Sequence, residues 1–148
     1  MSITLRHIGL VVQNLDVALN FWTLGMGFNV VSHQKESRPF IDNLVGLENV
    51  DLTTVKLRDD SDNTLELLKF FSHPSEDVWS GSISSTGLTH IALNVDHLDD
   101  FIDRMKDYGV ALLSEPQRSP DKMVLVAFAE GPEGLIIELV EKLQDEKY

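Results

Sequence analysis

The 148-residue chain contains no cysteine. This absence excludes disulfide bonds, metal sites built from thiolates, and catalysis by a cysteine nucleophile. Chains without disulfides are typical of reducing compartments, so we expect a cytoplasmic protein.

Basic residues are also few: 12 Lys and Arg stand against 24 Asp and Glu, which gives a formal net charge of −12. A nucleic-acid surface needs clustered basic side chains, so we expect no nucleic-acid partner. No segment approaches the roughly 20 apolar residues that a membrane helix needs. The first residues also lack the basic and apolar regions of a signal peptide. We therefore expect no membrane partner either.

Several catalytic motifs do not occur in the chain. It has no glycine-rich phosphate loop, no Gly-x-Ser-x-Gly turn and no cluster of cysteine and histidine. Its length and its hydrophobic fraction of 43% fit one ordinary globular domain with a sizeable core. The functional clue lies instead in a duplication.

The chain contains two copies of one pattern. The strand-like sequence Arg-His-Ile-Gly-Leu-Val-Val around His7 recurs as Thr-His-Ile-Ala-Leu-Asn-Val around His90. Each copy ends with a glutamate inside an apolar run, Glu66 in Leu-Glu-Leu-Leu and Glu138 in Ile-Ile-Glu-Leu-Val. Two histidines and two glutamates therefore occupy matching places in a repeated unit.

A helix is predicted after each histidine strand, near residues 14–25 and 96–108. Asn14 and Asp96 are the expected N-caps, and glycines end both helices. Apolar residues recur at helical spacing, which predicts one buried face on each helix. The predicted buried faces are Leu15, Ala18, Leu19 and Trp22 in the first helix, and Leu98, Phe101, Ile102 and Met105 in the second.

Further apolar runs predict the strands of each copy. They lie at residues 3–12, 28–31, 55–57 and 64–71 in the first copy, and at 87–95, 110–113, 123–129 and 134–141 in the second. Each copy is thus a βαβββ module. Module one covers about residues 3–71, a polar linker covers 72–86, and module two covers about 87–141, within a single domain of residues 1–148.

Two stretches outside the regular pattern have their own interpretation. Residues 32–50 are expected to be irregular, and the extra length of the first copy there could form an active-site flap. Trp79, in the linker, is interpreted as covering a neighbouring surface rather than contacting substrate. The charged tail after Val140 is expected to fray.

Strand alternation predicts which way the histidines point. His90 shares one face with Ala92 and Asn94, and the apolar alternate residues share the other face, under the helix. His7 has the same parity, with Gly9 two residues later. A small residue after each histidine leaves room for a ligand on that face, so we expect it to open on a cavity.

A carboxylate inside an apolar strand is costly to bury unless a cation or strong donors compensate it. Basic partners are scarce in this sequence. A divalent metal ion (Ni, Co, Zn, Mn or Fe) held by His7, Glu66, His90 and Glu138 would compensate both glutamates. Any one of these residues alone could be an ordinary surface or core polar group, but their joint recurrence favours a metal site. The remaining histidines are expected at the surface: His33, His73 and His97.

These motifs resemble those of the vicinal oxygen chelate superfamily, which includes glyoxalase I, methylmalonyl-CoA epimerase, extradiol dioxygenases, fosfomycin-resistance enzymes and bleomycin-resistance proteins. The resemblance covers about residues 3–141 and rests on residues 6–12, 64–68, 89–95 and 128–139. It implies an α+β fold of two tandem βαβββ modules, whose curved sheets surround a cleft with a metal site. It also implies a homodimer.

Within that superfamily, the residue at position 66 separates the chemistries. Glyoxalase I-like members carry Glu there, epimerase-like members usually Gln, and dioxygenases manage with two His and one Glu. Glu66 therefore favours isomerase or epimerase chemistry. Glu48 is interpreted as a surface residue rather than an epimerase's additional catalytic glutamate. Candidates for binding glutathione or coenzyme A are Arg6, Lys56, Arg58 and Arg118.

The leading hypothesis is a metal-dependent lyase, isomerase or epimerase acting on a small molecule, which could be a thioester or thiol conjugate. The metal would bind two neighbouring substrate oxygens and stabilise the enediolate formed when Glu138 or Glu66 removes a proton next to a carbonyl. One alternative is a non-haem iron extradiol-type dioxygenase using His7, His90 and Glu138. Another is a metal-free protein that binds a small molecule or drug. The four ligands could come from one chain or from two chains of a dimer, and we expect one chain.

Overall fold

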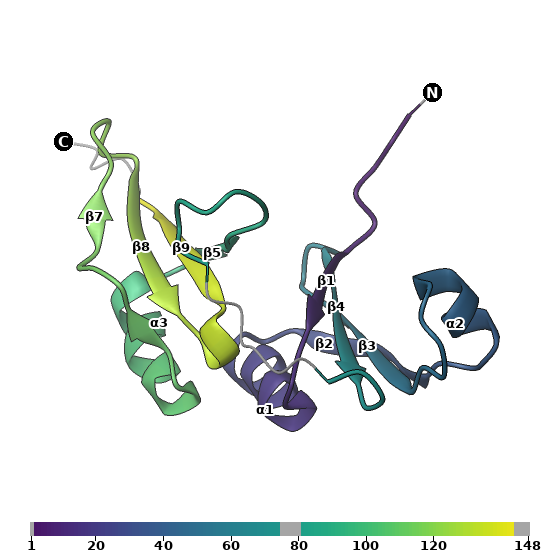
Figure 1. The fold of residues 1–148 in the computed structure, drawn as a ribbon. Coiled ribbons are helices and arrows are strands. Elements are labelled where there is room, and N and C mark those ends of the chain that lie inside the picture. The colour runs from purple at the N-terminus through teal and green to yellow at the C-terminus, as the bar shows by residue number, and fades with distance from the viewer. Residues whose placement is uncertain (1, 75–80, 144–148) are drawn as a thin grey trace. The chain divides into compact units, whose positions relative to one another are not determined.

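The computed structural model describes residues 2–74 and 81–143 (Figure 1). Contacts along the chain divide it into two units, Met1–Glu76 and Asp77–Tyr148, and each is described by itself. Trp79 and the end of the charged tail lie outside the described residues, so the expectations about them stay predictions.

The first unit contains one four-stranded sheet. Its strands β1, β4, β3 and β2 lie in that order, with β1 parallel to β4 and the other pairs antiparallel. A π-helical segment, Phe21–Gly25, extends α1. The elements in chain order are β1 (Ile8–Val11), α1 (Leu15–Asn20), β2 (Asn29–Lys35), α2 (Phe40–Val45), β3 (Leu52–Arg58) and β4 (Thr64–Phe70).

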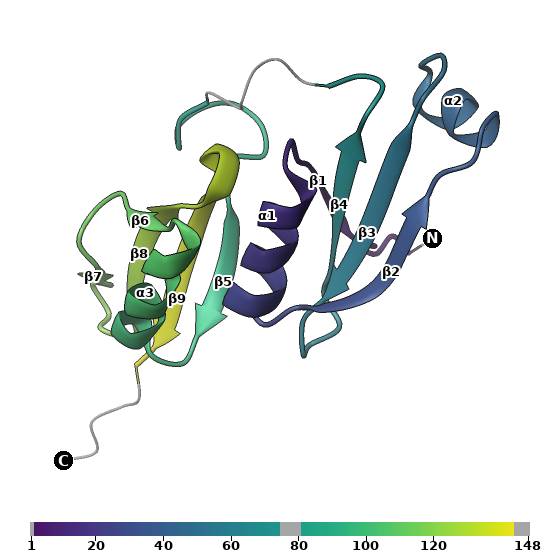
Figure 2. The same cartoon turned by 90° about the horizontal axis from the view of Figure 1, so that it is seen from below.

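The second unit repeats this arrangement. Its sheet has the order β5, β9, β8 and β6, with the short β7 also paired to β8, and β5 is parallel to β9. Helix α3 packs against β9 (Figure 2). The elements are β5 (Ile91–Val95), α3 (Leu98–Met105), β6 (Ala111–Leu112), β7 (Gln117–Arg118), β8 (Val124–Glu130) and β9 (Ile136–Lys142). The predicted α+β fold of two βαβββ modules is confirmed.

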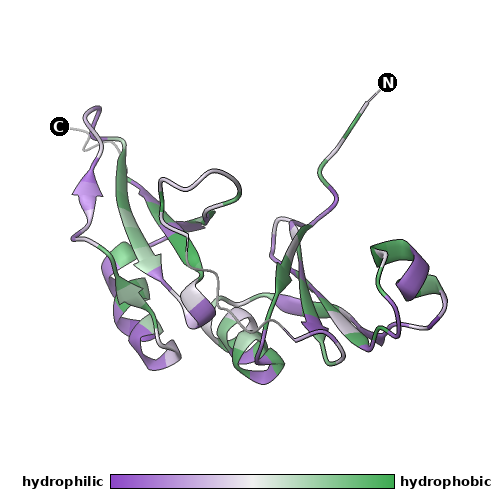
Figure 3. Ribbon diagram, viewed as in Figure 1, coloured by the Kyte–Doolittle hydropathy of each residue, from purple (hydrophilic) through white to green (hydrophobic). Residues whose placement is uncertain are grey.

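Alternate residues of the central strands form the core of each unit. In the first unit the buried cross-strand pairs are Val55 with Leu67 and Leu57 with Leu65. In the second they are Ala127 with Leu139 and Ala129 with Ile137. Figure 3 shows β8 as hydrophobic along most of its length. Because side chains alternate along a strand, the neighbouring positions, including Glu66 and Glu138, point to the opposite face.

The predicted helix faces are only partly confirmed. Ala18, Trp22, Leu98 and Met105 are buried, whereas Leu15, Leu19, Phe101 and Ile102 are half-buried. The ring of Phe101 lies 5.3 Å from the guanidinium carbon of Arg104, which keeps that ring near the helix surface.

The two predicted N-caps behave differently. Asn14 is confirmed, since its Oδ1 accepts a hydrogen bond from the backbone N–H of Val17 at 3.1 Å. The prediction of Asp96 as the N-cap of α3 is wrong. The N-cap is His97, and its side chain makes no capping hydrogen bond. Instead the N–H of Leu98 donates to Oε2 of Glu141 at 2.7 Å. Glu141 reaches this place because it is the partner of Val95 in the parallel pairing of β5 and β9.

The region expected to be irregular, residues 32–50, is more ordered than predicted. Strand β2 continues to Lys35, and α2 follows. Pro39 and Gly46, which the prediction treated as breakers, are the ends of this helix. Pro39 is its N-cap and Gly46 its C-cap, with the left-handed φ of 71° that glycine tolerates best. Strands β1 and β5 also begin later than predicted, at Ile8 and Ile91. None of the described helices is long and apolar enough to cross a membrane.

Candidate metal centre

In the first candidate pair, His7 directly precedes β1 and Glu66 lies on β4. In the parallel pairing of these strands, Gly9 is the partner of Glu66. His7, two residues earlier, brings its Nε2 to 3.1 Å from Oε2 of Glu66. The Glu66 side chain is only 14% exposed, so its charge needs compensation.

The second pair, His90 and Glu138, repeats this geometry. Ala92 is the partner of Glu138 in the parallel pairing of β5 and β9. His90 Nε2 lies 3.2 Å from Oε2 of Glu138, whose side chain is 25% exposed. In both units the small residue two positions after the histidine thus lies opposite the glutamate. The four predicted ligands thus form two equivalent His–Glu pairs, one in each unit.

The neighbours of the two glutamates differ. Lys56 is the cross-strand partner of Glu66, and its Nζ lies 3.7 Å from Oε1. Phe128 holds the corresponding place beside Glu138. Although basic residues are scarce in the sequence, Glu66 has a basic partner in Lys56. The signal was present in the sequence: a hairpin turning at residues 59–63 sets Lys56 opposite Glu66.

The outer nitrogens of the two histidines also differ. Nδ1 of His90 lies 2.9 Å from the hydroxyl oxygen of Thr89, and the ring packs edge-on against Phe128 with centroids 5.2 Å apart. Nδ1 of His7 is buried and has no hydrogen-bond partner among the described residues. A metal-ligating imidazole ordinarily donates its other N–H to a partner that fixes the ring. His90 has such a partner in Thr89.

The donor atoms fit a divalent metal ion. Two ligand atoms each about 2.1 Å from one ion lie roughly 3.0 Å apart at a right angle and about 3.4 Å apart at a tetrahedral angle. The observed Nε2–Oε2 separations, 3.1 and 3.2 Å, fall in this range. Within residues 2–74 and 81–143, no group of three or more His, Asp or Glu could hold a metal. Each pair by itself therefore supplies two ligands.

The other residues singled out from the sequence lie at the surface. His33, His73 and His97 are exposed, as predicted, and so is Glu48. Of the candidates for binding glutathione or coenzyme A, only Lys56 is half-buried. The exposed ones are Arg6, Arg58 and Arg118.

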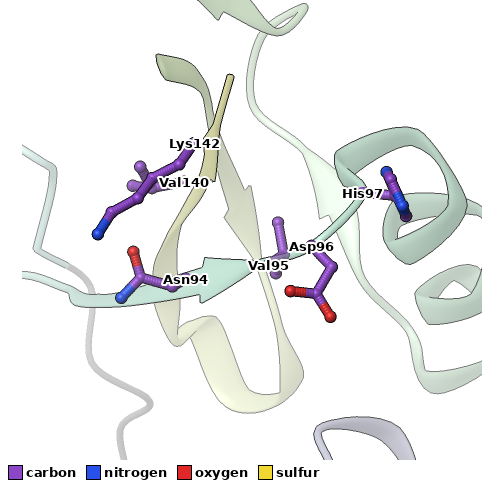
Figure 4. Close-up of a pocket in the computed structure, with 6 residues that line it drawn as sticks. All are labelled: Asn94, Val95, Asp96, His97, Val140 and Lys142. Carbon is purple, nitrogen blue, oxygen red and sulfur yellow. The ribbon is translucent and has the colours of Figure 1, made fainter. Parts of the chain in front are cut away.

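The second unit also has an open pocket of about 550 Å³ at the ends of β5 and β9. Asn94 and Val140, which line it, are partners in the parallel pairing and follow Ala92 and Glu138 by two residues. Figure 4 shows the side chains of Asn94 and Lys142 on one side of the pocket, and those of Asp96 and His97 on the other. The strand face that carries Glu138 thus leads into a pocket with a mixed polar and apolar lining.

Comparisons with known proteins agree with this architecture. The chain is 29% identical, over 131 residues, to the uncharacterized protein YurT of Bacillus subtilis (strain 168), covering 88% of this chain and 93% of YurT. A glyoxalase family protein from Bacillus cereus has a similar structure, with a TM-score of 0.89, 20% identity and 97% of each chain covered.

A second similar structure is that of the fosfomycin resistance protein FosX from Listeria monocytogenes, complexed with Mn(II) and sulfate ion. Its TM-score is 0.64 at 15% identity, with 99% of this chain and 98% of FosX covered. A family model for the glyoxalase/bleomycin resistance protein/dioxygenase superfamily matches residues 6–128. With this match spanning most of its length, the chain belongs to the glyoxalase/bleomycin resistance protein/dioxygenase superfamily.

Proposed function

We propose that this protein is a divalent-metal-dependent enzyme, a lyase, isomerase or epimerase, which removes a proton next to a carbonyl group of a small molecule. The observation that carries the proposal is the repeated His–Glu pair. Two half-buried glutamates, each within 3.2 Å of an imidazole nitrogen, recur at the same register position of two sheets. The pair recurs with the same geometry although the residues beside the two glutamates differ, Lys56 in one unit and Phe128 in the other, which favours a role for the pair itself.

The residues that would hold the metal are His7, Glu66, His90 and Glu138. The proposal requires the two modules to form one domain, so that both pairs bind a single ion. When bound, the ion would act as a Lewis acid toward two neighbouring substrate oxygens. Two nitrogen and two carboxylate ligands suit Zn, Ni, Co, Mn or Fe. The Mn(II) in the structure of FosX supports a divalent ion.

The carboxylates would move the proton. Glu66 and Glu138 each have one oxygen beside an imidazole nitrogen; the second oxygen of Glu66 faces the ammonium of Lys56, and that of Glu138 forms no ion pair with a described Lys or Arg. A carboxylate within reach of a C–H bond made acidic by a neighbouring carbonyl can accept its proton. A second group then returns a proton to the product. Two carboxylates at one site provide both roles, which suits isomerisation or epimerisation.

The substrate would be a small molecule, of a size that the pocket of about 550 Å³ at the ends of β5 and β9 can hold. We also propose a homodimer, as the sequence resemblance implies. The half-buried Lys56 is the only one of the four sequence candidates for binding an anionic conjugate that lies beside a His–Glu pair.

The test begins with metal analysis of the purified protein, followed by thermal unfolding with added Ni, Co, Mn or Zn. Candidate 2-oxo thioesters are then incubated with the metal-loaded protein in deuterated water. We expect bound metal, a higher unfolding temperature and solvent exchange of the proton next to the carbonyl. Absence of both metal and metal stabilisation would point instead to a small-molecule binding protein. Oxygen consumption that survives Glu66→Ala would point to a dioxygenase.

A further inference from the structure

The two His–Glu pairs have the same geometry but different charges around them. Both oxygens of Glu66 are in contact with nitrogen groups: Oε2 with His7 at 3.1 Å, and Oε1 with the ammonium of Lys56 at 3.7 Å. The Lys56 side chain is 35% exposed, so the ion pair is only partly screened by water. No described Lys or Arg forms an ion pair with Glu138.

The duplication provides an internal comparison for Lys56. Lys56 and Phe128 are the antiparallel partners of Glu66 and Glu138, at equivalent places in the two sheets. One glutamate therefore faces a fixed positive charge, and the other faces an aromatic ring that packs against its histidine. The two pairs differ in charge while their backbone register is the same.

A fixed ammonium affects a nearby metal ligand in two ways. It already compensates the carboxylate's charge, so the carboxylate gains less from binding a metal ion. It also repels a divalent cation placed at the same carboxylate. Both effects weaken the bond between Glu66 and a metal, and no described Lys or Arg forms an ion pair that would exert them on Glu138.

We propose that Lys56 weakens the bond between Glu66 and a metal ion, so that the pair of His90 and Glu138 binds the metal more tightly than the pair of His7 and Glu66. This inference rests on the proposed function, because it presupposes a bound metal. A displaced Glu66 keeps its charge compensated by Lys56. Lys56 acts through Glu66 as a positioning residue.

The test is a titration of metal-free protein with Co²⁺ at constant ionic strength, followed by calorimetry and by visible absorption. Lys56→Met removes the charge and keeps a long side chain, and Lys56→Arg retains the charge. Phe128→Met is the matched control, because it changes the equivalent position without changing charge. Lys56→Gln is a second neutral variant in case Lys56→Met does not fold.

We expect Lys56→Met to bind Co²⁺ about tenfold more tightly than the wild type. Lys56→Arg should bind as the wild type does, and Phe128→Met should not bind more tightly. In a Glu66→Gln background, removing the charge of Lys56 should no longer tighten binding, because the effect passes through Glu66. A lysine that only stabilises the pairing of β3 and β4 would produce neither result.

Two results would overturn the inference alone: unchanged or weaker Co²⁺ binding in both neutral variants, or a tightening that persists with Glu66→Gln. A wild-type protein that binds no Co²⁺ would be a different failure. It would overturn the proposed metal-dependent function, and the inference with it.

Discussion

The imidazole rings of His7 and His90 are held in different ways, although both contact a glutamate. Thr89 and Phe128 fix the ring of His90, one by a polar contact at Nδ1 and the other by edge-on packing. His7 has no partner for its buried Nδ1 among the described residues. The His90 ring is therefore oriented before a metal ion binds. Removing the hydroxyl group of Thr89 tests whether this orientation contributes to metal binding.

Thr89→Val removes that hydroxyl and keeps the shape of the side chain. We expect metal affinity to fall by about tenfold, the lower end of what loss of such an outer contact costs, at an unchanged unfolding temperature. A Co²⁺ titration measures it. Arg6→Ala is the control, because Arg6 is exposed and precedes His7 as Thr89 precedes His90. Equal affinity in Thr89→Val and the wild type would show that the hydroxyl does not support the ligand.

The structure pairs the residues that the duplication singled out, and their role as metal ligands stays a prediction. The repeat identified His7 with Glu66 and His90 with Glu138, because matching positions in two copies fold alike. The role of Lys56 beside Glu66 was not predicted. That contact depends on the register of β3 against β4 across the turn at residues 59–63, and the prediction placed the two strands without pairing their residues.

At the scale of elements, the parallel pairing of the first and last strand of each unit has a second consequence. It brings Glu141 of β9 to the start of α3, where its carboxylate accepts the hydrogen bond from Leu98 N–H. A negative charge at this end of a helix is stabilising. The cap of α3 therefore comes from a residue distant in sequence.

Glu141→Ala should reduce the free energy of unfolding by about 1 kcal/mol, as the loss of an N-cap does. Asp96→Ala should change it little, because Asp96 makes no capping bond. Urea unfolding of both variants measures the difference. A larger loss with Asp96→Ala than with Glu141→Ala would contradict the assignment of the cap.

The turn between β3 and β4 is held by Asp59, and it sets the register that pairs Lys56 with Glu66. Although partial burial raises its pKa, hydrogen bonds from the side chain and backbone of Asn63 and from Ser61 lower the pKa of Asp59 below the ordinary 3.8. Its contribution to stability is therefore complete above that value and is lost as the pH falls through the lower folded-state pKa.

Asp59→Ala should lower the free energy of unfolding at pH 7 by about 1 kcal/mol or less, because the turn is exposed to solvent. The difference from the wild type should shrink as the pH falls below 3.8, where the wild-type carboxylate becomes protonated. Unfolding curves over that range measure it. A difference that grows toward acid pH would contradict the sign of the shift.

The regular elements were largely predictable, because apolar periodicity reports which face of a strand or helix is buried. Helix α2 was missed, since Pro39 and Gly46 are helix ends as well as breakers, and a six-residue helix has too few turns to show a periodic pattern. The two-residue strand β6 was predicted and the two-residue strand β7 was not, because only β6 lies in an apolar run.

For the whole molecule, the repeat predicted two modules because each copy carries its own helix face and sheet face to bury. The number of chains that contribute to one metal site does not follow from the repeat. A dimer can share ligands between chains, and a single chain can supply all four. Our proposal is that each chain supplies its own site.

Mixing two double variants distinguishes these arrangements under conditions of subunit exchange. One variant carries His7→Ala with Glu66→Ala, and the other carries His90→Ala with Glu138→Ala. We expect no recovery of metal binding in the mixture, because every site within a chain would lack two ligands. Exchange is verified by labelling one variant with heavy isotopes, so that mixed dimers are resolved by mass. Partial recovery would instead show that sites are shared between chains.

The central claim, that two His–Glu pairs bind one metal ion, is tested most directly by counting Co²⁺ ions bound per chain at saturation. The account predicts one ion per chain in the wild type, and binding weakened by about a hundredfold or more when either His7→Ala or His90→Ala removes a ligand from one module. Two ions per chain, or one variant that keeps wild-type affinity, would contradict it, because each pair would then act as a separate site.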